Sequence, residues 1–210
     1  MLTIAEDFIL LVLDPRTGDF RRLKTDDLHA GLVGASVMEL ALRERTDSDD
    51  ETLWVLDAKP TGYDSLDLIL SAMAEPGFPK DIGKIIGALM PLAERVEMNV
   101  LSKLRARKVI ATGEARNLML RKVTRHAILD AAPLRQTKER LTRMLMGEEL
   151  PDPRDVCLMT LVKACGLLEE VIPKAGSAEA MERLNGFSTM DLMGKHVQRY
   201  LEGVERGAAG

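Results

Sequence analysis

One segment near the start of the chain limits the fold more than any other. Thr3 and Glu6 form the hydroxyl-to-carboxylate pattern of a capping box, which predicts a helix that continues to about Leu13. From Phe8 to Leu13 every side chain is apolar. A helix that is apolar on all sides is buried, because on the surface it would expose a hydrophobic face to water. The sequence therefore predicts a helix that other elements surround.

The remainder of the chain predicts more helices, with few strands. Proline and glycine breaks separate the periodic apolar segments. The expected helices cover residues 27–45, 64–74, 81–108 with a kink or an internal boundary at Pro91, 133–146, 154–172, 178–184 and 189–202. The expected strands cover residues 53–56, 109–114 and 118–129, of which the last two form a β-hairpin. We therefore expect one mainly α domain over residues 1–206, followed by a frayed tail at 207–210.

The composition excludes several classes of protein. Of the 210 residues, 46% are hydrophobic and 30% are charged, as in a folded domain. Aromatic residues are only 3%, too few for an RNA-binding sheet or an aromatic carbohydrate cleft. The longest nearly apolar run, residues 85–93, is much shorter than the roughly 20 residues of a membrane-spanning helix. The N-terminal segment has no basic leader, so we expect a cytoplasmic protein.

Sequence motifs give no support for catalysis or metal binding. His29, His126 and His196 lie far apart in the sequence and lack metal-binding spacing. The acidic segment 47–51 lacks the glycine and the terminal glutamate of a calcium-binding loop. No nucleophile motif or phosphate-binding glycine loop is present in the sequence. We expect a protein that is not an enzyme and that uses no cofactor and no metal ion.

Positive charge is concentrated in one part of the sequence. The window from Lys103 to Arg143 holds twelve Lys and Arg residues and only three acidic residues, whereas the whole chain has a net charge of −4. A concentration of this kind is typical of proteins that bind a polyanion, either nucleic acid or an anionic membrane. The alternative interpretation is a solvated face on a helix-rich protein.

The predicted hairpin carries an apolar tip between basic residues. Successive side chains of a strand point to opposite faces, so three consecutive apolar residues cannot all face one core. An exposed apolar tip can enter the acyl boundary of a bilayer while neighbouring cations meet anionic head groups. The residues predicted to insert are Leu118, Met119 and Leu120. The residues predicted to contact anionic lipid are Arg105, Arg107, Lys108, Arg116, Arg121 and Lys122.

Two other interpretations of the hairpin stay open. It could be buried in a protein partner or in a second copy, which would make the chain a soluble adaptor or dimerisation module. The basic helix end at residues 103–108 and the hairpin could also serve as the recognition helix and wing of a winged-helix DNA binder. An apolar tip is poorly suited to phosphate contact and the overall charge is negative, so nucleic acid is the least expected partner.

Five segments of the chain resemble the Golgi phosphoprotein 3 family, in the same order. They are LTIAEDFILLVLDPRTG, AGLVGASVMELALRER, PTGYDSLDLIL, VLSKLRARKVI and PDPRDVCLMTLVKACGLLEEVIP, and together they extend from Leu2 to about Ile172. The resemblance implies a single helical domain in which amphipathic helices ring a central bundle and a β-hairpin protrudes. It suggests a short, bacterial member of the family.

The resemblance also implies a function at membranes. Eukaryotic members bind phosphatidylinositol 4-phosphate in a shallow basic pocket, insert an apolar hairpin loop and act as adaptors for the cytosolic tails of Golgi glycosyltransferases. The apolar loop matches residues 118–120 of this chain. The implied partners are thus an anionic lipid, a phosphoinositide among them, and a protein cargo or a second copy that meets the hairpin. The implied location is the cytoplasmic face of a membrane.

The family's lipid pocket matches this sequence poorly. The pocket tryptophan of the family falls at Lys24, one pocket arginine falls at Val33, and two further arginines fall at Glu94 and Glu97. Carboxylates at the last two positions would repel a phosphate monoester. The sequence therefore predicts a membrane-facing side without the phosphoinositide specificity of the eukaryotic pocket.

Overall fold

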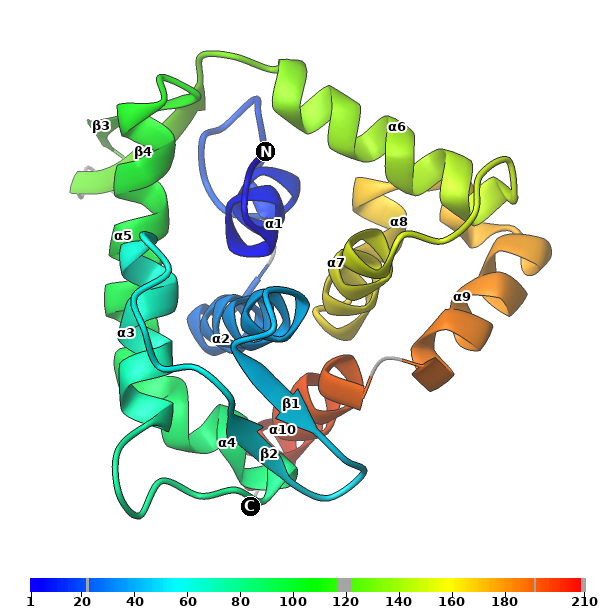
Figure 1. Cartoon of the computed structure of the whole chain (residues 1–210). Helices are drawn as coiled ribbons and strands as arrows, with labels where there is room; N and C mark the ends of the chain where they lie inside the picture. Colours follow the sequence, from blue (N-terminus) through cyan, green and yellow to red (C-terminus); the bar gives the residue numbers. More distant parts are fainter. Residues whose placement is uncertain (22, 117–121, 191, 209–210) are drawn as a thin grey trace.

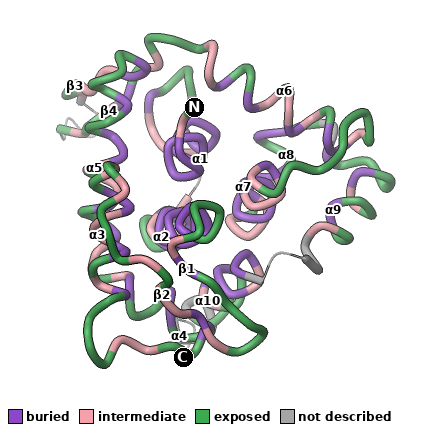
Figure 2. Tube along the Cα trace, viewed as in Figure 1, coloured by how far each residue is buried: buried purple, intermediate pink, exposed green. Residues whose placement is uncertain are grey.

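Three helices lie at the centre of the fold. The computed structural model describes residues 1–21, 23–116, 122–190 and 192–208. Within them, α1 (Ile4–Val12), α2 (Thr25–Leu42) and α7 (Pro153–Ala164) pack against one another in the middle of the molecule (Figure 1). Figure 2 shows that buried residues are concentrated in these helices, whereas the periphery is largely exposed. The mainly α fold that the sequence predicts is thus confirmed.

The first helix begins where the capping box predicts. The Thr3 hydroxyl accepts the backbone N–H of Glu6 at 3.2 Å, and a Glu6 carboxylate oxygen accepts the backbone N–H of Thr3 at 2.7 Å. Every residue of α1 is buried, the charged Glu6 and Asp7 included. An apolar run without a polar face therefore lies at the centre of the fold, surrounded by other elements as expected.

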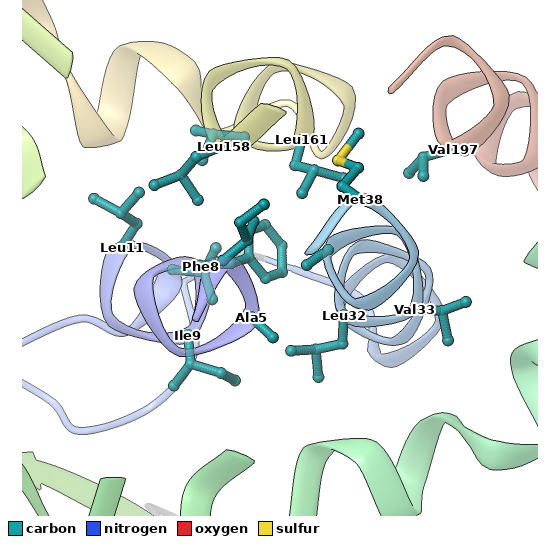
Figure 3. Packing of buried hydrophobic residues seen from close by; sticks show 14 of the residues in the cluster. Ala5, Phe8, Ile9, Leu11, Leu32, Val33, Met38, Leu158, Leu161 and Val197 are labelled. Carbon is teal, nitrogen blue, oxygen red and sulfur yellow. The ribbon is translucent and has the colours of Figure 1, made fainter. Parts of the chain in front are cut away.

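Two glycines of α2 allow its neighbours to approach closely. A Cβ atom at Gly31 would lie 2.4 Å from the Phe8 ring, and one at Gly34 would lie 2.5 Å from a methyl group of Val197. Figure 3 shows Phe8 between α1 and α2, with Leu158 of α7 on the far side. The small residues of α2 thus set the spacing of the central helices.

The remaining helices ring this centre. They are α3 (Asp64–Met73), α4 (Ile82–Leu89), α5 (Ala93–Ala106), α6 (Ala132–Met146), α8 (Leu168–Val171), α9 (Ala178–Met190) and α10 (Leu192–Ala208), with 3₁₀ turns at Met90–Leu92 and Pro173–Gly176. Helix α5 is amphipathic, because Val96, Val100 and Leu104 recur every four residues on its buried face. In the described ranges, no helix is long and apolar enough to cross a membrane.

Two antiparallel hairpins stand at opposite ends of the molecule (Figure 1). Strands β1 (Thr46–Ser48) and β2 (Leu53–Val55) form the acidic hairpin, and strands β3 (Ile110–Arg116) and β4 (Lys122–Ile128) form the basic hairpin. The basic hairpin is paired without a break from Ile110 opposite Ile128 to Arg116 opposite Lys122. Its strands directly follow α5 and lead into α6, so it joins two helices of the ring.

Some element boundaries differ from the prediction. Of the two outcomes expected at Pro91 in the segment 81–108, the structure shows the boundary, because Pro91 lies in a 3₁₀ turn between α4 and α5. The expected helix over residues 154–172 is also divided, since Gly166 adopts a left-handed φ of 68° after α7 ends. The single glycine inside this helical pattern therefore had a larger effect than the sequence suggested.

Some strand and terminal boundaries also differ from the prediction. Asp47 and Ser48 belong to β1 and pair with β2, so the acidic segment is not wholly a loop. Strand β3 continues through Gly113 to Arg116, beyond the expected end of the strand. Helix α10 extends to Ala208, so residues 207 and 208 are helical. Residues 209 and 210 lie outside the described ranges.

Candidate functional site

The base of the basic hairpin is fixed to the turn that follows α1. The backbone N–H of His126 donates to the carbonyl of Gly18 at 2.7 Å. The Phe20 ring lies 5.6 Å from the imidazole, and the Arg125 guanidinium lies 3.4 Å from an Asp19 carboxylate oxygen. The hairpin is therefore anchored at its base by a segment that lies about a hundred residues earlier in the chain.

His126 is a structural residue of this base. Its side chain is 6% exposed, and its Nδ1 lies 3.0 Å from the Thr112 hydroxyl on the paired strand. Burial lowers the pKa of His126, and the charge of Arg105 acts in the same direction against the nearby carboxylates of Glu97 and Asp19. The imidazole is thus neutral at physiological pH and stabilises the hairpin by packing and hydrogen bonding.

We expect Gly18→Ala to loosen the hairpin base. Gly18 has a φ of 72°, and an added Cβ would lie 3.1 Å from the His126 carbonyl oxygen. The backbone strain at a positive φ and the close contact of the new Cβ together should lower the free energy of unfolding by about 2 kcal/mol. Urea denaturation measures this loss. Gly62→Ala introduces the same backbone strain without a contact, and Gly113→Ala introduces neither, so their costs should be about 1 kcal/mol and near zero. Equal losses in all three variants would contradict the anchoring role of Gly18.

The distal half of the basic hairpin is exposed. Gly113, Glu114, Lys122 and Thr124 are all exposed, and the Lys122 ammonium pairs with the Glu114 carboxylate at 3.0 Å. The residues expected to insert into lipid, Leu118, Met119 and Leu120, lie outside the described residues together with Arg121. The backbone of Arg116 closes the described part of β3 opposite Lys122. The structure thus places the two strand ends that flank the predicted apolar tip.

The predicted cations at the end of α5 have different surroundings. Arg105, Arg107 and Lys108 are all exposed. The Arg107 guanidinium lies 3.5 Å from the buried carboxylate of Glu6 and donates to the Met1 carbonyl at 3.3 Å, so it also ties α5 to the start of α1. Lys108 adopts a left-handed φ of 57° and closes the helix. Arg105 and Lys108 are therefore more available to a ligand than Arg107.

A cavity of about 370 Å³ separates α5 from the base of the hairpin. Arg105 and His126 line it together with the carboxylates of Asp19 and Glu97. The Glu97 carboxylate lies 3.0 Å from the imidazole of His29, so it also interacts with a residue of α2. The charge of this cavity is therefore mixed, without the excess of cations that a phosphate monoester requires.

Comparison with models of known protein families gives a match over most of the chain. The family model described as Golgi phosphoprotein 3 (GPP34) matches residues 4–204. The chain belongs to the Golgi phosphoprotein 3 family. No curated protein matches the chain. The family match extends past Ile172, where the sequence resemblance ended, and includes nearly all of α9 and α10.

In this Golgi phosphoprotein 3 domain, the four expected pocket positions do not provide a cationic pocket. Val33 is 0% exposed, and Figure 3 shows it on the side of α2 that faces away from α1. Glu94 is exposed in the first turn of α5, and Glu97 is partly buried beside His29. Lys24 is the residue before α2. These positions supply one ammonium, one buried methyl-bearing side chain and two carboxylates.

The sequence did not single out the residues that anchor the hairpin. Gly18 and Asp19 belong to the turn that follows α1, and no local pattern links that turn to His126, which is distant in the sequence. The same applies to the pair formed by Arg107 and Glu6. A pair of distant residues leaves no periodic signal in a single sequence, because periodicity reports on one element at a time.

Metal and thiol chemistry find little support in the Golgi phosphoprotein 3 domain. Among the described residues, no group of three or more His, Cys, Asp or Glu side chains could hold a metal ion. Neither Cys157 nor Cys165 forms a disulfide bond in the described part of the chain. Burial raises the pKa of the Cys165 thiol to about 12, with a smaller contribution from the charge of Asp27, so this thiol stays protonated.

Proposed function

We propose that this Golgi phosphoprotein 3 domain is a non-enzymatic domain that binds the surface of an anionic membrane. The observation that carries the proposal is the exposed distal half of the β3–β4 hairpin, whose strand ends flank the apolar sequence Leu118-Met119-Leu120. Lys122 begins β4, and Arg116 and Arg121 flank the same triplet in the sequence. A tip with this composition suits the boundary between head groups and acyl chains.

The expected binding is weak and reversible. Each cation near an anionic leaflet contributes about 1 kcal/mol. Each Leu or Met side chain contributes about 1.5–3 kcal/mol when fully buried, and less when it is only partly inserted. Three cations and three apolar side chains therefore hold one copy of the protein on a membrane only briefly. A second contact on the same membrane would prolong binding.

Head-group recognition in this proposal depends on charge and not on a phosphoinositide pocket. Two of the family's pocket arginines are replaced by Glu94 and Glu97, and a third is replaced by Val33, which is fully buried. The cavity between α5 and the hairpin carries the acidic Asp19 and Glu97 as well as Arg105. A phosphate monoester in that cavity would meet repulsion as well as attraction, so plain anionic lipids should serve equally well.

Co-sedimentation with vesicles tests the proposal. Neutral, plain anionic and phosphatidylinositol 4-phosphate vesicles of matched charge are compared at low and physiological salt. We expect both anionic kinds to bind about tenfold or more tightly than neutral vesicles, and alike, with weaker binding at higher salt. A clear preference for the phosphoinositide would contradict the charge-based mechanism, and no binding to any vesicle would contradict the proposed function.

A variant at the predicted tip distinguishes membrane binding from the adaptor or dimerisation interpretation. Leu118→Asp removes an apolar side chain from the predicted tip and should weaken vesicle binding without a change in molecular mass. Mass measurement by light scattering over a range of concentrations provides the control. If the wild type is a dimer that Leu118→Asp dissociates, the tip meets a second copy, and the proposal is wrong for this surface.

A further inference from the structure

A second candidate site lies on α6, away from the distal hairpin. A groove of about 660 Å³ extends along this helix, and its volume is within the 300–1,000 Å³ range that is usual for small-molecule sites. Pro15, Ile128 and Leu134 give it an apolar lining, to which Ala131 contributes a methyl group. Leu134 is buried and Ile128 is partly buried, so the lining is continuous with the core of the domain. We call this feature the α6 groove.

Lys138 gives the α6 groove a charged residue. Leu134, Lys138 and Thr142 follow one another at four-residue intervals, so they share one row along the helix. The Lys138 side chain is partly buried, and the described residues offer its ammonium no hydrogen bond and no ion pair. The Thr142 hydroxyl donates to the backbone carbonyl of Lys138 at 2.7 Å and leaves the ammonium free to bind a ligand.

Lys138 is poorly accommodated when it is charged and unpaired. Burial lowers the pKa of Lys138, and the positive charge of Arg21 acts in the same direction. An anion beside the ammonium would offset both effects. The groove also holds the cations Arg135 and Arg143 and the exposed carboxylates of Glu139 and Glu148, so its lining carries one net positive charge. That charge matches a monoanion better than a dianionic phosphate.

We propose that the α6 groove binds one fatty acid, with its carboxylate at the Lys138 ammonium and its hydrocarbon chain along Leu134, Ile128 and Pro15. An apolar lining with one partly buried cation that has no ion pair is complementary to an amphiphile that has one carboxylate and one chain. A bare anion would leave the apolar lining in water, and a neutral lipid would leave the ammonium unpaired. This site is independent of the proposed membrane function, because it lies at the base of the hairpin and not at its tip.

Calorimetric titration of the whole chain with octanoate tests the site. Acetate has the same head group without a chain, and 1-octanol has the same chain without a charge. We expect octanoate to bind about tenfold or more tightly than either of the other two. Equal affinity for acetate would show that the hydrocarbon chain contributes nothing to binding. Equal affinity for 1-octanol would show that the carboxylate, and hence Lys138, contributes nothing to binding. Either result would overturn the proposal.

Two substitutions of Lys138 locate the carboxylate. Lys138→Met keeps the apolar stem and should weaken octanoate binding about tenfold, whereas Lys138→Arg should retain most of it. Lys59→Met, which removes an exposed lysine far from the groove, is the matched control and should have no effect. An affinity for octanoate within twofold of wild type in Lys138→Met would overturn the proposal.

The variant Lys138→Met should fold, because it removes an unpaired and partly desolvated charge. Its thermal midpoint at pH 7 is expected to equal or exceed that of the wild type. If light scattering shows a dimer that Lys138→Met dissociates, and octanoate does not bind, the groove belongs to a second copy of the chain and the proposal is overturned. Variants at the hairpin tip should bind octanoate normally, so failure of this site and failure of the membrane function are distinguishable.

Discussion

Reversal of three charges at the end of the basic hairpin should release the protein from anionic vesicles. The changes are Arg116→Glu, Arg121→Glu and Lys122→Glu. Loss of three cations at about 1 kcal/mol each weakens binding about a hundredfold, and repulsion of the new carboxylates weakens it further. Flotation of vesicles at physiological salt measures the effect. Lys122 pairs with the exposed Glu114, and an ion pair of this kind adds little to stability, so the fold should be retained.

The matched control reverses three lysines elsewhere on the molecule. Lys59, Lys80 and Lys84 are exposed and lie in or beside the α3–α4 region, away from the basic hairpin (Figure 1). Their conversion to glutamate changes the net charge by the same amount. If the control loses as much binding as the hairpin variant, net charge alone controls binding and the assignment of the hairpin surface is wrong. Circular dichroism confirms that both variants are folded.

Glu39→Gln should lower the free energy of unfolding by about 3 kcal/mol. The Glu39 carboxylate is 2% exposed and accepts the backbone N–H of Ile4 at 2.8 Å. It also accepts from Arg43 at 2.7 Å and from Arg154 at 2.8 Å, and Arg154 donates in addition to the carbonyl of Leu2. Loss of the carboxylate charge leaves two guanidinium groups without their counterion, one of them largely buried. The start of α1 would lose its link to α2 and α7.

Chemical and thermal unfolding measure this loss. For a chain of this length, 3 kcal/mol corresponds to a fall in Tm of about 6–12 °C. Glu75→Gln, which changes an exposed carboxylate, should leave Tm within about 1 °C of wild type. Arg154→Met added to Glu39→Gln should cost less than the sum of the two single changes, because one unpaired charge is removed. A strictly additive result would show that these two side chains are not coupled.

Local signals predicted the centre of the fold well. The capping box and the apolar run fixed the start and the burial of α1, because both are properties of adjacent residues. The small size of Gly31 and Gly34 is also visible in the sequence, and the structure identifies Phe8 and Val197 as their neighbours. The hairpin was predicted at its true place, although β3 extends to Arg116, two residues beyond the expected end.

The details of the candidate site depend on distant residues. The link between Gly18 and His126 and the pair formed by Arg107 and Glu6 join segments about a hundred residues apart in the sequence. Whether Val33 faces a pocket or the core depends on which helix packs on that side of α2. A single sequence predicts the elements, but the partner of each face is decided by the packing of the whole chain.

The positions of the two hairpins make the molecule an electric dipole. The acidic β1–β2 hairpin carries Asp47, Asp49, Asp50 and Glu51, and the basic β3–β4 hairpin stands at the opposite end (Figure 1). Near a negatively charged surface, such a distribution produces a torque that turns the basic end toward the surface before contact. The consequence is kinetic: orientation during approach raises the fraction of collisions that begin with the hairpin, and added salt should slow association more than it speeds release.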